Sequence, residues 1–345
     1  MALTRFPGLI DVHVHLRDPG ATQKEDFRTG SKAGLKGGFT FLIDMPNNPV
    51  PTITPERLQE KIALADEKAT CDIGFHYGTN GHNLQSFKKA WDNPRVFGLK
   101  VYCNETTGEL LVEDPRLLDE IWKAWESQKP ILVHAEGAQL AVALDLAKKY
   151  KRRIHVCHVS LAKEIELIHQ AKLENIEASS GVCPHHLFLL KEDEQRLGAK
   201  GLMKPPLPTP DDQAALWEGV QNGVIDLVET DHAPHLLSEK ETGKATFGVP
   251  GLETALGLLG KALKEHKIQE DDIVRLLHDN PQKIFEVPPQ ENTFVEVDFE
   301  KTFRVGDKGY ETKCGWSPFE GWELPGLVQQ VVLRGETLYS LDRHE

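Results

Sequence analysis

Short apolar runs recur along the first three quarters of the chain and alternate with longer amphipathic segments. These runs are rich in β-branched and aromatic residues and are mostly bounded by Gly, Pro or Asn, which is typical of buried parallel strands. The pattern predicts eight strands, at residues 8–16, 39–45, 71–78, 96–103, 130–136, 153–160, 176–183 and 226–233.

Helical patterns fill the intervals between the strands. At Thr54-Pro55 and Thr209-Pro210, a capping hydroxyl precedes a proline suited to the first helical turn. The first of these helices should run to about Lys68, and the second should begin at the second signal. Further helices are predicted at 114–127, 137–150, 160–172, 251–266 and 270–278.

Eight strands, each followed by a helix or by room for one, predict an α/β fold of the closed (β/α)₈ type, a TIM barrel. The chemistry of such a barrel lies at the C-terminal ends of its strands. A doubly wound open sheet is the alternative, but no Gly-rich phosphate-binding fingerprint follows the first strand.

The chain changes character after residue 285. Residues 293–299 alternate apolar and polar side chains, 328–338 are again strand-like, and a Gly/Pro-rich stretch at 306–326 separates them. We therefore predict a barrel over 1–285 and a small β-rich C-terminal appendage over 286–345 that packs on it.

Composition narrows the function classes. Forty basic and 53 acidic residues give a net charge of −13 among 345 residues, which argues against a nucleic-acid or anionic-membrane surface. No run approaches the length of a membrane-spanning helix, and the first residues lack the apolar stretch of a signal peptide. The five scattered cysteines fit a reducing compartment. We expect a soluble, cytoplasmic enzyme or binding domain.

Histidines gather where a barrel would carry out its chemistry. Nine of the fifteen lie in or just after predicted strands 1, 5, 6, 7 and 8: His13, His15, His134, His155, His158, His185, His186, His232 and His235. His13 and His15 are two residues apart on one strand, so both side chains should point into the barrel. His134, His158 and Asp231 end three other strands. Each of these residues alone fits a structural role, but together they predict a metal site, and imidazole nitrogen suits zinc.

Lys100 is unusual because it lies late in a predicted buried strand, where an unpaired ammonium is costly. One interpretation is an ion pair with Glu105 or Glu136. The other is carboxylation by CO₂, which replaces the cation with an anionic carbamate whose two oxygens can bridge two metal ions.

The motifs resemble those of dihydroorotases in the amidohydrolase superfamily, most closely the dihydroorotase domain of the multifunctional animal-type pyrimidine-synthesis protein. The resemblance covers nearly the whole chain. Its motifs are residues 7–20 (PGLIDVHVHLRDPG), 45–47, 98–100, 104–106, 134–136, 157–159, 184–187, 231–235, 250–254, 316–321 and 331–336.

The resemblance implies two zinc ions bridged by carboxylated Lys100. One zinc would be held by His13, His15, Lys100 and Asp231, and the other by Lys100, His134 and His158. It further implies that Arg17, Asn47 and His235 recognise the substrate, and that Thr106 lies at the tip of a closing loop, 104–109.

The implied reaction is the reversible cyclisation of N-carbamoyl-L-aspartate to L-dihydroorotate in pyrimidine biosynthesis. A hydroxide between the two zincs would attack the ring amide carbonyl, and Asp231 would shuttle the proton to the leaving nitrogen. Arg17 can grip the substrate carboxylate bidentately, whereas substrates of hydantoinase-type relatives lack that group. The alternative, purely structural interpretation of Arg17 is a surface ion pair with Asp18.

Two positions depart from the family pattern. A third zinc in close members would use a cysteine matching Cys157 and a glutamate whose position here carries Gly181, so we expect two metals. An expected substrate-binding arginine is replaced by Lys204, which keeps the charge without the planar fork. Lys204 is either a substrate contact or a solvated loop lysine.

Two rival functions remain at this point. One is a sister cyclic amidase, hydantoinase or allantoinase; the other is a dihydroorotase-like scaffold domain without catalysis. The retention of all six metal-ligand types favours an enzyme. By analogy with its relatives, the domain could form a homodimer and belong to a larger pyrimidine-synthesis protein.

Overall fold

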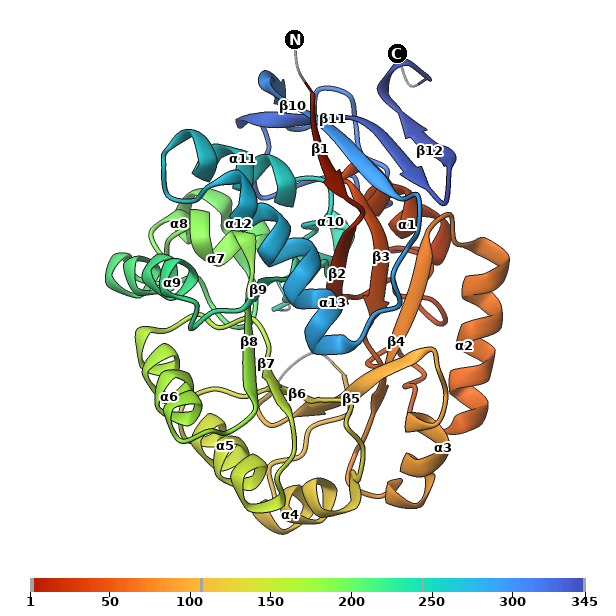
Figure 1. The fold of residues 1–345 in the computed structure, drawn as a ribbon, viewed down its shortest axis with the longest axis vertical. Coiled ribbons are helices and arrows are strands. Elements are labelled where there is room, and N and C mark those ends of the chain that lie inside the picture. The colour runs from red at the N-terminus through yellow and green to blue at the C-terminus, as the bar shows by residue number, and fades with distance from the viewer. Residues whose placement is uncertain (1–2, 106–107, 244, 344–345) are drawn as a thin grey trace.

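The structure, a computed structural model, describes residues 3–105, 108–243 and 245–343. Its centre is a parallel sheet whose eight strands follow one another in chain order (Figure 1). These strands are β2 (Leu9–Val14), β3 (Phe39–Asp44), β4 (Asp72–Gly78), β5 (Val96–Tyr102), β6 (Ile131–His134), β7 (Ile154–Val156), β8 (Ala178–Val182) and β9 (Leu227–Val228). All eight predicted strands are confirmed.

The ring closes between its first and last strands. Val14 forms a parallel bridge with His232, and the amide of His15 donates to the carbonyl of His232 at 2.8 Å. The last strand is shorter than predicted because the chain leaves the extended conformation after it, with φ of 44° at Asp231. The fold is therefore a (β/α)₈ barrel, as predicted.

Helices surround the barrel on its outside (Figure 1). They are α1 (Phe27–Lys36), α2 (Pro55–Lys68), α3 (Phe87–Trp91), α4 (Pro115–Ala124), α5 (Ala138–Tyr150), α6 (Ala162–Leu173), α7 (Pro184–Phe188), α8 (Asp193–Leu197), α9 (Pro210–Asn222), α10 (Leu237–Lys240), α11 (Ala255–Lys264), α12 (Glu270–Val274) and α13 (Asn280–Phe285). Short 3₁₀ segments are η1 (Leu84–Ser86), η2 (Gly198–Gly201) and η4 (Leu341–Arg343), and η3 (Arg275–Asp279) is a π-helical turn.

The predicted helix starts are correct in detail. The hydroxyls of Thr54 and Thr209 accept from backbone amides three residues later, at the N-termini of α2 and α9. The predicted helix at 270–278 is α12 continued by the π-helical turn η3. Among the described residues, no helix has the length and apolar character needed to cross a membrane.

A second, antiparallel sheet packs beside the barrel, in the order β1-β10-β11-β12. Its strands are β1 (Thr4–Pro7), β10 (Phe294–Arg304), β11 (Glu323–Leu333) and β12 (Glu336–Ser340). Sequence patterns did not predict β1, which pairs with β10 through the register Phe6↔Val295. The sheet therefore draws on both sides of the boundary predicted at residue 285.

An apolar cluster fills part of the barrel interior. Ile10, Val12, Phe41 and Phe97 belong to one buried cluster that also includes Phe285 at the end of α13. The ring of Phe285 lies against His76 and His155, with centroids 5.7 and 5.1 Å away. The side chains toward the C-terminal ends of the strands are instead polar, and they form the site.

Candidate metal centre

The six predicted ligands come from five barrel strands or the turns that follow them. His13 lies in β2 with His15 just beyond it, Lys100 lies in β5, and His134 is the last residue of β6. His158 and Asp231 follow β7 and β9, both with positive φ, 39° and 44°. Left-handed backbone at non-glycine residues is costly and concentrates at functional sites.

One half of the cluster joins His13, His15 and Asp231. The Asp231 carboxylate lies 2.9 Å from Nε2 of His15 and 3.3 Å from Nε2 of His13. On the other side of His15, Nδ1 lies 2.8 Å from Oδ1 of Asn47. These contacts bring three predicted ligands within coordinating reach of one point, and their ligand atoms lie within 4.8 Å of one another.

The other half joins His134 and His158. Nδ1 of His134 lies 3.0 Å from Nε2 of His158, and the ring of His158 lies 5.3 Å from that of His13, which connects the two halves. Nδ1 of His158 is buried without a hydrogen-bond partner among the described residues. Buried polar atoms are normally satisfied. This one is an available nitrogen ligand.

Lys100 is fully buried, and its Nζ donates to Sγ of Cys157 at 3.1 Å. The ion pair considered in the sequence does not form, because Glu105 pairs with Lys204 and Glu136 with His134. A thiol is weak compensation for a buried ammonium. This environment suits a lysine that is modified or neutral when the site is loaded.

Electrostatics keep most of the imidazoles neutral. Burial lowers the pKa of His15 to about 4, and burial together with His134 and Lys100 lowers that of His158 well below its ordinary value. Burial also disfavours a charged His13, but Asp231 and Glu229 raise the pKa of His13 to about 10. Burial opposes ionisation of Asp231, yet His13 and His15 hold its pKa well below the usual range. Neutral imidazoles and an ionised carboxylate are the forms that bind metal ions, so His13 would release a proton when a metal binds.

Beside this cluster, the cationic side chains of Arg17 and Lys24 flank the ring of His235. Arg17 is buried, and it donates from Nε to the carbonyl of Pro234 at 3.2 Å and approaches Nε2 of His235 at 3.1 Å. No carboxylate pairs with it in the part of the chain that the structure describes. Asp18 pairs with Lys68 instead at 2.7 Å, so the surface ion pair considered for Arg17 is wrong.

The remaining predicted residues differ in placement. Asn47 lies against His15, while Lys204 lies at the edge of the site, 3.4 Å from Oε2 of Glu105 and over the ring of Phe247. Thr106 lies outside the described residues.

Sequence reasoning missed Glu229, in the segment that links β9 to Asp231. This fully buried carboxylate contacts His13. His13, Cys157 and Glu229 together form a second group with metal-binding geometry. An acidic residue in a predicted buried strand was the available signal. Cys183, His185 and His186 form a third such group beside the site.

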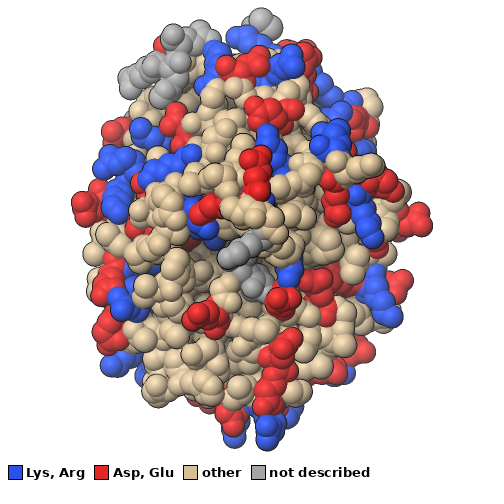
Figure 2. Space-filling view, turned by 180° about the vertical axis from the view of Figure 1, so that it is seen from behind, with Lys and Arg blue, Asp and Glu red and all other residues tan. Residues whose placement is uncertain are grey.

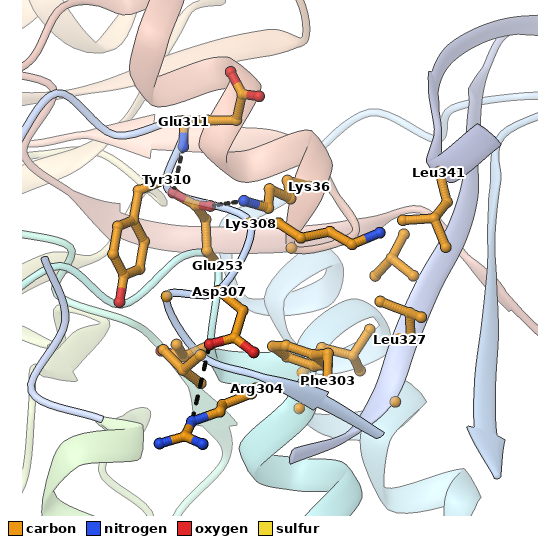
Figure 3. A pocket seen from close by; sticks show the side chains of 18 of the residues that line it. Lys36, Glu253, Phe303, Arg304, Asp307, Lys308, Tyr310, Glu311, Leu327 and Leu341 are labelled. Carbon is orange, nitrogen blue, oxygen red and sulfur yellow. Dashed lines mark hydrogen bonds and ion pairs between the residues drawn. The ribbon is translucent and has the colours of Figure 1, made fainter. Parts of the chain in front are cut away.

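A cavity of about 440 Å³ lies away from this cluster, where the second sheet meets α1 and α11 (Figure 3). Lys36 and Glu253 pair at 2.8 Å on its wall, and Arg304 and Asp307 line it further on. None of the predicted ligands lines it. On the molecular face in Figure 2, acidic and basic side chains are interspersed.

The (β/α)₈ barrel thus brings side chains of metal-ligand type from five strands to one mouth. The model of the amidohydrolase family matches residues 4–285, and the chain belongs to this family.

The relatives agree with the resemblance predicted from the motifs. The chain is 43% identical over 341 residues to the multifunctional protein CAD of Squalus acanthias, covering 98% of this chain and 15% of that protein. It is 34% identical over 350 residues to a dihydroorotase of Pyrococcus abyssi, covering 98% and 84%. The chain thus spans about 15% of the length of the multifunctional relatives. These relatives support the predicted class, a hydrolase acting on cyclic amides.

Solved structures share the fold closely. An L-hydantoinase (dihydropyrimidinase) from Arthrobacter aurescens superposes with a TM-score of 0.92 at 25% identity, covering 97% of this chain and 85% of that one. The inactive dihydroorotase-like domain of a CAD-like multifunctional protein from Chaetomium thermophilum gives 0.82 at 27% identity, covering 98% and 95%.

Proposed function

We propose that this chain is a zinc-dependent dihydroorotase that interconverts N-carbamoyl-L-aspartate and L-dihydroorotate in de novo pyrimidine synthesis. The observation that carries the proposal is the buried guanidinium of Arg17, which lies beside the histidine cluster and forms no ion pair with the described residues. A buried cation without a carboxylate is costly, and a substrate carboxylate would compensate it.

The residues present fit two zinc ions. His13, His15 and Asp231 would hold one, His134 and His158 the other, and carboxylated Lys100 would bridge them. The orphan nitrogen of His158 and the weakly compensated Lys100 support this assignment. When bound, such metals lower the pKa of water and polarise a carbonyl oxygen.

Other steps of the reaction depend on side chains of this chain, which bind the substrate, orient a metal ligand and transfer the proton. Arg17 and His235 bind the substrate carboxylate, and Asn47 orients His15 through its ring nitrogen. Asp231, ionised and at the open end of the barrel, takes a proton from the attacking water and returns it to the ring nitrogen. Lys204 and Thr106 would contact or cover the substrate from the loop side.

The hydantoinase-type alternative is supported by the structural neighbours, and the scaffold alternative by the inactive dihydroorotase-like domain. Arg17 favours an acidic substrate over hydantoin, and the converged ligands favour catalysis over a scaffold. Purified protein should be assayed in both directions with dihydroorotate and carbamoyl-aspartate, beside hydantoin and allantoin. Turnover of hydantoin alone would reject the proposal, and so would a zinc-loaded protein without turnover of any of these substrates.

Because two relatives are multifunctional proteins, we further propose that the domain works within a larger pyrimidine-synthesis protein. We also propose that it is cytoplasmic and associates as a homodimer. Light scattering of the purified chain tests the dimer directly, since a monomer at micromolar concentration would reject it.

A further inference from the structure

Glu229 occupies the space beneath the predicted metal centre. It is fully buried, and its Oε1 accepts from the backbone amide of His158. Its Oε2 lies 3.3 Å from Nδ1 of His13 and 3.4 Å from Nε2 of His155. One carboxylate therefore reaches a predicted ligand of each metal ion.

The absence of a side chain at residue 181 creates this space. A Cβ added to Gly181 would lie 2.6 Å from Cδ of Glu229 and 2.7 Å from its Oε1. Those distances are too short for two side chains to coexist. A carboxylate can thus enter this volume from β9 because β8 contributes none.

The contact with His13 matters because a histidine binds a metal through one neutral ring nitrogen. Donation from Nδ1–H to a carboxylate fixes the tautomer and leaves the lone pair on Nε2. In this structure Nε2 of His13 faces Asp231 at 3.3 Å, on the side of the other ligands. The bond to the amide of His158 similarly holds a residue with left-handed backbone, φ 39°.

We propose that Glu229 is a positioning residue, which fixes the tautomer of His13 and the backbone of His158 so that both rings present lone pairs to the metal ions. The proposal rests on the zinc centre of the proposed function. A direct role as ligand of a third metal is less favoured, although His13, Cys157 and Glu229 lie within coordinating distance of one another. The two carboxylate oxygens already face the backbone amide of His158 and one ring nitrogen each of His13 and His155.

The test compares Glu229→Ala and Glu229→Gln with the exchange variant Gly181→Glu/Glu229→Ala, which returns a carboxylate to the same volume from β8. Zinc affinity is measured by chelator competition, metal content by elemental analysis, and ligand geometry by the absorption of the cobalt-substituted protein. Kinetics give kcat and KM separately.

We expect two zincs in the wild type. Loss of a supporting carboxylate typically weakens metal affinity by about 10–100-fold, so Glu229→Ala should show such a loss, an altered cobalt spectrum, and a lower kcat with little change in KM. The zinc affinity and kcat of Glu229→Gln should lie between those of the wild type and Glu229→Ala, because the glutamine amide keeps one acceptor oxygen. The exchange variant should recover most of the zinc affinity.

Glu164→Gln is the matched control, because this buried glutamate also accepts from backbone amides, those of Ser160 and Leu161. It should lower the melting temperature without changing zinc affinity. Unchanged zinc affinity and cobalt spectrum in Glu229→Ala would overturn the positioning role alone. Three zincs in the wild type and two in Glu229→Ala would also overturn the positioning role, because Glu229 would then be a ligand of a third metal. A wild type that binds no zinc would instead reject the proposed function itself.

Discussion

The guanidinium of Arg17 and the imidazole of His235 face each other, with Nη2 of the arginine 3.1 Å from Nε2 of the histidine. Nζ of Lys24 approaches the other ring nitrogen, also at 3.1 Å. Burial and these two cations lower the pKa of His235 to about 2, so the ring is neutral at ordinary pH. The Arg17 guanidinium forms no ion pair with the described residues, so an anionic group of the substrate would fit beside it.

Substitution of Arg17 should therefore discriminate among substrates. Arg17→Met removes charge-assisted hydrogen bonds worth about 1.5–3 kcal/mol, which corresponds to roughly a 10–100-fold higher KM for dihydroorotate. Zinc content should not change, because the hydrogen bonds of Arg17 among the described residues go to Pro234 and His235, and neither is a predicted metal ligand. Arg17→Lys should be intermediate, since it keeps the charge without the fork. An unchanged KM in Arg17→Met would remove it from substrate recognition.

Lys100→Ala should disassemble the metal pair. Without a bridging carbamate, we expect the zinc content to fall below two per chain and turnover to fall by more than about 100-fold, beyond the usual cost of losing only a supporting group. Lys240→Met is a suitable control, because this buried lysine donates to the carbonyls of Leu202, Thr246 and Gly248 instead. It should lower thermal stability and keep both zincs. A Lys100→Ala protein with two zincs and full turnover would refute the carbamate.

Asp231→Asn should separate proton transfer from substrate binding. An amide cannot take a proton from the attacking water, and loss of a general base typically costs about 10²–10⁴-fold in rate. We expect kcat to fall by that factor, with a smaller change in KM and some loss of zinc, because the same residue is a predicted ligand. Near-wild-type kinetics would exclude Asp231 as the proton shuttle.

Acid should destabilise the metal-free protein through its buried neutral histidines. His186 donates from Nε2 to the carbonyl of Pro205, and burial lowers its pKa from 6.5 to about 4. Between these values the unfolded chain binds the extra proton, so stability falls as pH drops below 6.5. His186 alone should lower the free energy of unfolding by about 2 kcal/mol between pH 7.5 and pH 5.

Urea unfolding of chelator-treated protein at the two pH values measures this loss. His186→Gln should unfold with a smaller pH dependence than the wild type, whatever its stability at pH 7.5. His169→Gln, at an exposed position, provides the control for replacing a histidine as such. An unchanged pH dependence in His186→Gln would show that its proton uptake on unfolding is negligible.

Much of the barrel could be predicted from local patterns. Buried parallel strands are apolar on both faces, and threonine-proline signals mark helix starts, so each leaves its own trace in the sequence. Strand β1 left no such trace, because it is four residues long and is stabilised by pairing with β10, almost 290 residues away. Long-range pairing of this kind is invisible to a local pattern.

For the site, the sequence by itself determined which residue types end each strand: the histidines, Lys100, Asp231 and Arg17. Their spacing was enough, because parallel strands in a barrel bring their C-terminal ends to one mouth. Only the tertiary structure decided the contacts among them. It separated Lys100 from Glu105 and Glu136, and it left Arg17 without an ion pair among the described residues. It also placed the side chain of Glu229 in the volume that Gly181 leaves open. These outcomes depend on side-chain volume and direction across neighbouring strands, which no single strand encodes.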